Sequence, residues 1–219
     1  MKTGQYIAII MMVVEMLGAY MFLKTKSTLK RIVLSSLALG FAYAIVIADI
    51  LPDATEDFQW GYLICIGAVG IMFLIEIGVK HFGNNAAAGA MAFHNFFEGL
   101  VVMSRPSISL LLVAGIVLHK LPEGMTTFSL LDHIKNDKVK FVIAAAIGLL
   151  IPIGTLCVVP ESISKPITAF AAGCMLYAIS KSVKKIVLEH FEASPSAKKG
   201  MVSAAMVGAI IGGISCLLI

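Results

Sequence analysis

The chain has 219 residues, of which 59% are hydrophobic and only 14% are charged. A chain this apolar cannot form a soluble globule, so the composition predicts an integral membrane protein. The formal net charge of +4 comes from short basic clusters between apolar runs, which excludes a basic nucleic-acid-binding domain. The four cysteines are isolated and form no Cys-x-x-Cys motif, so no disulfide framework is expected.

Eight apolar segments follow one another along the chain, and none shows the alternation typical of a membrane β-barrel. Each is close to the ~20 residues that a helix needs to cross a bilayer. The sequence therefore predicts an all-α, polytopic protein in which residues 1–219 form a single transmembrane domain. The predicted spans are residues 6–23, 32–51, 60–79, 86–103, 108–131, 139–159, 167–188 and 201–219.

The basic residues are distributed unevenly between the two sides of these spans. Thirteen of the seventeen lysines and arginines fall in the connections after the first, third, fifth and seventh spans or in the adjoining ends of those spans. Because cytoplasmic loops are enriched in lysine and arginine, these connections are expected on the cytoplasmic side. Both termini are then expected on the non-cytoplasmic side.

Acidic residues interrupt the first two segments. Glu15 lies in the middle of the first span, where we expect a hydrogen-bonded structural carboxylate. Asp49 and Asp53 lie four residues apart at the end of the second span, so a helix would stack them on one face. At that outer mouth, two carboxylates would concentrate cations and begin an access route.

The fourth and fifth spans each carry a histidine and a glutamate four residues apart, and this pair of units is the centre of the sequence. On a helix this spacing puts the imidazole and the carboxylate on one face. Ionisable groups at membrane depth are costly and are functional by default. Imidazole nitrogens with carboxylate oxygens suit Zn²⁺, and also Fe²⁺ or Mn²⁺. The units read His94-Asn95-Phe96-Phe97-Glu98-Gly99 and His119-Lys120-Leu121-Pro122-Glu123-Gly124.

In order and on adjacent spans, His-Asn-Phe-x-Glu-Gly and His-x-x-Pro-Glu-Gly resemble the signature of the ZIP family of divalent-metal transporters. The resemblance implies an inverted repeat around the fourth and fifth spans, both termini outside, a homodimer, and metal transport toward the cytoplasm. The substrate would bind to His94, Glu98, His119 and Glu123, with Asn95 as a further ligand. Asp49 stands where the family has a histidine.

Several positions depart from the family pattern. Lys120 and Ile151 replace two acidic residues that bind a second metal in some relatives, so a single metal site is expected. We expect the ammonium of Lys120 to contact Glu98, Glu123 or Asn95. Lys181 occupies a place where the family often has a release-side ligand. His81, in the short connection after the third span, is the sole candidate there for capture of the metal on the release side.

Three functions are consistent with these residues. The favoured prediction is a multi-pass membrane transporter of Zn²⁺, with Fe²⁺ or Mn²⁺ as alternative substrates, that is not an enzyme and needs no organic cofactor. The second is a metal-binding sensor of the same fold that does not transport. The third is an intramembrane metal hydrolase, disfavoured because His-Glu-x-x-His is absent.

Overall fold

The computed structural model describes residues 3–56, 58–78, 85–104, 110–192 and 194–216. Every regular element in these ranges is helical, which confirms the all-α prediction for the described chain. The elements are α1 (Thr3–Lys24), α2 (Thr28–Ile45), the π-helix η1 (Val46–Ile50), α3 (Leu51–Thr55), α4 (Gly61–Gly78), α5 (Ala86–Ser104), α6 (Leu110–Leu130), α7 (Asp137–Gly154), α8 (Glu161–Glu192) and α9 (Pro195–Cys216).

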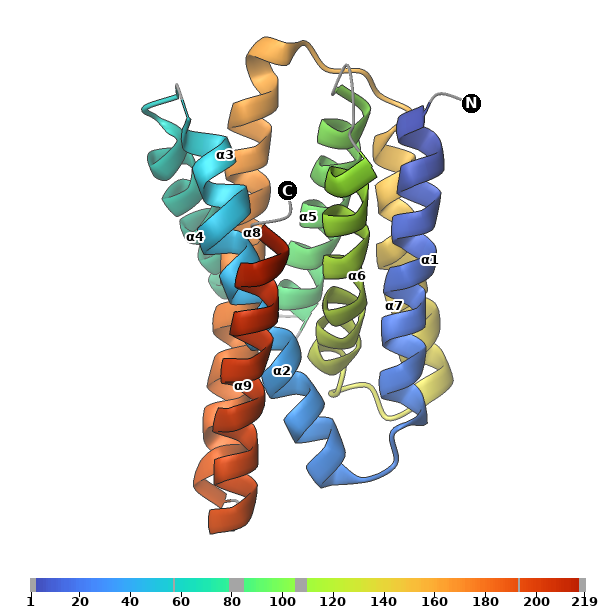
Figure 1. Cartoon of the computed structure of the whole chain (residues 1–219), viewed down its shortest axis with the longest axis vertical. Coiled ribbons are helices and arrows are strands. Elements are labelled where there is room, and N and C mark those ends of the chain that lie inside the picture. Colours follow the sequence, from blue (N-terminus) through green and yellow to red (C-terminus); the bar gives the residue numbers. More distant parts are fainter. Residues whose placement is uncertain (1–2, 57, 79–84, 105–109, 193, 217–219) are drawn as a thin grey trace.

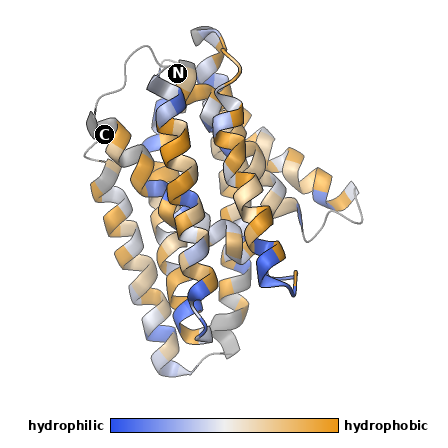
Figure 2. Cartoon of the chain, turned by 90° about the vertical axis from the view of Figure 1, so that its right-hand side faces the viewer, coloured by the Kyte–Doolittle hydropathy of each residue, from blue (hydrophilic) through white to orange (hydrophobic). Residues whose placement is uncertain are grey.

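The predicted spans correspond to these helices in order, with α2, η1 and α3 joined into one continuous rod. Six helical segments within the described residues are long and apolar enough to cross a membrane. The other two long helices, α6 and α7, pack against α1. Figure 2 shows hydrophobic residues along the lengths of the helices, as expected for a multi-pass membrane protein.

The helices form two packed groups (Figure 1). In the first, α1 packs on α6 and α7, and α7 also packs on α5. In the second, α2 packs on α9, and α4 packs on α8. Contacts of α5 with α8 and of α2 with α6 join the groups. The two helices that carry the histidine-glutamate units therefore lie inside the bundle.

Local sequence explains where several helices begin. The Asn136 side chain accepts hydrogen bonds from the backbone amides of Lys138 and Val139, at 2.9 and 3.3 Å, and so caps the start of α7. The Ser27 side chain accepts from the Lys30 amide at the start of α2. Capping satisfies amides that have no partner inside the helix, which fixes the turns between consecutive spans.

Gly124 lets α1 and α6 approach until their backbones touch. A Cβ at Gly124 would overlap the carbonyl oxygen of Glu15. Close approach through small residues is how helices associate in lipid, where burial of apolar surface gives little driving force.

We predict that Gly124→Ala lowers the stability of the protein by about 1–3 kcal/mol, because the added methyl group forces α1 and α6 apart. The apparent melting temperature in detergent should fall accordingly. Gly70→Ala is the control, because a Cβ there meets no atom within 4 Å, and it should leave the melting temperature unchanged or slightly raised. Equal melting temperatures for the two variants would contradict this packing.

Candidate metal centre

Two helices, α5 and α6, carry the residues of the candidate metal centre. His94, Asn95 and Glu98 project from one face of α5, and His119 and Glu123 project from one face of α6. The helical repeat stacks the residues of each unit, and packing turns both faces inward. The side chains of His94 and Glu123 are 2% and 1% exposed, and that of Glu98 is 14% exposed.

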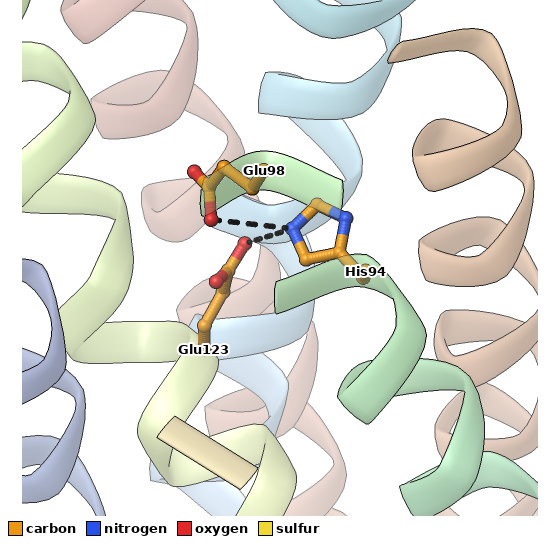
Figure 3. Close-up of side chains that lie close together, drawn as sticks. All are labelled: His94, Glu98 and Glu123. Atoms are coloured by element: carbon orange, nitrogen blue, oxygen red, sulfur yellow. Dashed lines mark ion pairs between the residues drawn. The ribbon is translucent and has the colours of Figure 1, made fainter. Parts of the chain in front are cut away.

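Three of these side chains converge on one point (Figure 3). One ligand atom each from His94, Glu98 and Glu123 lies within 4.8 Å of the others. Nε2 of His94 is 3.3 Å from Oε1 of Glu123 and 3.9 Å from Oε2 of Glu98. One nitrogen and two carboxylate oxygens are a donor set suited to Zn²⁺ and related divalent cations.

Two of these atoms lack a hydrogen bond and a cationic partner. Nε2 of His94 and Oε1 of Glu123 are buried without a hydrogen bond in the described protein, whereas Oε2 of Glu98 forms an ion pair with Nζ of Lys120. Nδ1 of His94 lies 3.2 Å from the carbonyl oxygen of Ala171. A carbonyl oxygen only accepts, so Nδ1 carries a proton and Nε2 is the ring nitrogen that faces the cluster. Buried polar atoms are normally hydrogen-bonded, so two such atoms without a hydrogen bond fit a site that binds a ligand.

His119, on the same helix as Glu123, also contacts the cluster. Its Nε2 is 2.9 Å from Oε1 of Glu98 and 3.8 Å from Oε1 of Glu123. The structure therefore brings together the four ligands expected from sequence, His94, Glu98, His119 and Glu123.

Lys120 lies beside the cluster and is completely buried. Its Nζ forms ion pairs with both Glu98 and Glu123, and donates a hydrogen bond to Oδ1 of Asn95 at 3.1 Å. All three partners that sequence suggested for this ammonium are in contact with it. One positive charge therefore sits between the two carboxylates and offsets part of their mutual repulsion.

Glu15 joins this network from α1. Its two carboxylate oxygens accept hydrogen bonds from Nδ2 of Asn95 at 2.9 and 3.0 Å. Nδ2 of Asn95 also donates to the carbonyl oxygen of Ile147 at 3.2 Å, so the amide orients its oxygen toward Lys120. Glu15 is hydrogen-bonded, as predicted from sequence, but its link to the site was not predicted. An acidic residue in the middle of an apolar span was the signal available.

A cavity of about 70 Å³ connects the cluster to the predicted outer mouth. Asp49 and Asp53 line it together with His94, Glu98 and His119. Asp49 lies in the π-helix η1 and Asp53 lies in α3. Both residues therefore belong to the continuous rod formed by α2, η1 and α3. The two aspartates thus share one cavity with His94, Glu98 and His119.

Two further predicted positions, Ile151 and Lys181, have other partners. Ile151 is fully buried among apolar residues of α1 and α5, including Ile7, Met11 and Val102. Lys181 on α8 forms an ion pair with Glu76 on α4, and the hydroxyl of Tyr177 donates to Glu76 at 2.8 Å. His81 lies outside the described residues.

Comparison with known proteins adds no identification. No protein-family model matches the chain, and no curated protein matches its sequence significantly. The function has to be argued from the site itself.

Proposed function

We propose that this chain is a ZIP-like transporter that carries Zn²⁺, or the related cations Fe²⁺ or Mn²⁺, across a membrane toward the cytoplasm. The observation that carries the proposal is the convergence of three buried ligand atoms from His94, Glu98 and Glu123, two of which, Nε2 of His94 and Oε1 of Glu123, have no hydrogen bond. Polar atoms buried without a partner have a high free energy, and a divalent cation would bind all three ligand atoms.

The route for the metal follows from the cavity. Asp49 and Asp53 would gather the ion at the outer mouth, and the cavity leads from them to the cluster. His94, Glu98, His119 and Glu123 would then bind it, with Asn95 as a further ligand if Lys120 moves aside. One metal is expected, because the ammonium of Lys120 would repel a second dication beside the first.

Transport would proceed by alternating access. In this proposal both termini face the non-cytoplasmic side, and the first three spans relate to the last three as an inverted repeat around α5 and α6. The group that contains α5 and α6 would move relative to the rest and expose the cluster inward. The same family resemblance suggests a homodimer.

We predict that acidification to about pH 5 lowers uptake several-fold. An imidazole must be neutral and a carboxylate ionised to bind a cation, so protons compete with the metal for these ligands. The measurement is the initial rate of Zn²⁺ uptake into proteoliposomes between pH 7.5 and pH 5, with recovery on return to pH 7.5 as the control. Undiminished metal affinity at pH 5 would count against this ligand set.

A sensor that binds metal without transport is the second candidate. It is favoured by the Lys181–Glu76 ion pair, which places a fixed cation where the family resemblance suggests release-side ligands. Zn²⁺ uptake into proteoliposomes, measured beside equilibrium binding to the purified protein, tests both functions. Zinc binding together with flux supports the transporter. Stoichiometric binding without flux in the wild type supports the sensor, provided that His119→Ala abolishes the binding. The absence of zinc binding overturns both functions.

A further inference from the structure

A long apolar groove lies between α2, α8 and α9, away from the metal cluster. Its volume is about 430 Å³, within the range of small-molecule sites. Ser36 and Tyr43 carry the only hydroxyl groups of its lining. The walls are formed by aliphatic side chains, among them Leu39, Ile179, Val183, Ile186, Met201 and Val202.

The floor of the groove is fixed by a backbone contact. Gly40 of α2 packs so closely on α9 that a Cβ there would overlap the carbonyl oxygen of Ala205. Both residues line the groove. Since α2 and α9 cannot approach further, the groove is preformed, which lowers the entropic cost of binding a flexible chain in it.

Four lysines lie near the helix ends at one end of the groove. Figure 1 shows that α2 and α9 begin, and α8 ends, at the same end of the molecule. Lys30 lies in the first turn of α2, Lys184 follows the groove residue Val183, and Lys198 and Lys199 lie in the first turns of α9. We call these four lysines the basic rim. None of them forms an ion pair with an acidic side chain that the structure describes.

An apolar groove with cations at one end is complementary to a molecule with an anionic head and a hydrocarbon tail. The rim also lies on the side assigned to the cytoplasm by the distribution of basic residues, where anionic lipids are enriched. We infer that the groove between α2, α8 and α9 is a binding site for an anionic glycerophospholipid, with an acyl chain in the groove and the phosphate at the basic rim. This site is independent of the metal cluster.

The headgroup is tested by removing charge from the rim. The full-length protein is reconstituted into nanodiscs of equal amounts of phosphatidylglycerol and phosphatidylcholine, and the lipids it retains on release are counted by native mass spectrometry. Wild type should prefer phosphatidylglycerol, and Lys198→Gln with Lys199→Gln should lower that preference by about fivefold for each charge removed. Lys135→Gln with Lys138→Gln, exposed lysines near the start of α7, is the control and should leave it unchanged.

The acyl chain is tested by filling the groove. Val202 lines it and is 52% exposed, whereas Val207 on the same helix is 46% exposed and lies outside it. Val202→Trp should reduce retention of both lipids, while Val207→Trp should retain them like wild type. Equal retention by the two variants, or no headgroup preference in wild type, would overturn the proposal. So would a change of oligomeric state in Val202→Trp with unchanged lipid retention, which would identify a contact between copies.

Discussion

Replacing Glu123 by glutamine is expected to lower zinc affinity more than about 100-fold and to abolish uptake, since even partners of metal ligands contribute 10–100-fold. The carboxylate of Glu123 offers the oxygen nearest to Nε2 of His94, and it also approaches Nε2 of His119 at 3.8 Å. The amide of glutamine keeps the shape of the side chain but removes its negative charge. Isothermal titration with Zn²⁺ and proteoliposome uptake measure the two effects.

Thr126→Ala is the matched control for Glu123→Gln. Thr126 is buried on the same helix, and its hydroxyl donates to the carbonyl oxygen of Pro122 within that helix. Its loss should leave zinc binding close to that of wild type. Zinc affinity in Glu123→Gln equal to that in Thr126→Ala would remove Glu123 from the ligand set.

Lys120→Met is expected to make the stability of the protein depend on zinc. Without the ammonium, the carboxylates of Glu98 and Glu123 face each other as uncompensated charges inside the bundle. Removing one partner of a buried ion pair costs about 3–5 kcal/mol, so the metal-free variant should melt well below wild type. Zinc supplies the missing positive charge and should raise its melting temperature more than it raises that of wild type.

Lys181→Met is the control that distinguishes this zinc-dependent stability from the destabilisation caused by losing any ion pair between helices. Lys181 pairs with Glu76, away from the metal cluster, so its replacement should also destabilise the protein. Zinc should not restore stability to Lys181→Met. The account of Lys120 is contradicted if metal-free Lys120→Met melts like wild type, or if zinc rescues both variants equally.

The helices could be predicted from sequence because apolar segments of membrane length have few alternatives to helix in lipid. Their ends were less predictable. Predicted span 139–159 overshoots α7, which ends at Gly154, and predicted span 167–188 is shorter than α8, which covers Glu161–Glu192. Hydropathy marks the part of a helix that lies in lipid and carries no information about how far the helix continues beyond it.

The pairing within each histidine-glutamate unit was also predictable, because the spacing of four residues fixes a common helical face. The contacts between helices were not. Glu15 and Asn95 are eighty residues apart in sequence, and only the packing of α1 against the bundle brings them together. The partner of Lys181 likewise comes from α4, and no local pattern indicates it.

The π-helix at Val46–Ile50 is a further feature that sequence did not predict. It ends two residues before Pro52, which cannot donate a backbone hydrogen bond, and π-helical turns often occur at functional sites. The wider turn contains Asp49, one of the two aspartates that line the cavity. Its place beside the cluster agrees with the role proposed for Asp49 in gathering the metal.

X-ray absorption at the zinc edge, recorded on the zinc-loaded protein, tests the proposed ligand set most directly. We predict a shell of nitrogen and oxygen atoms at about 2.0–2.2 Å, with an imidazole contribution that falls in His94→Ala and in His119→Ala. A sulfur shell at about 2.3 Å would instead assign the metal to cysteines, such as the buried Cys65 and Cys174. That result, or a spectrum unchanged in both histidine variants, would contradict the account.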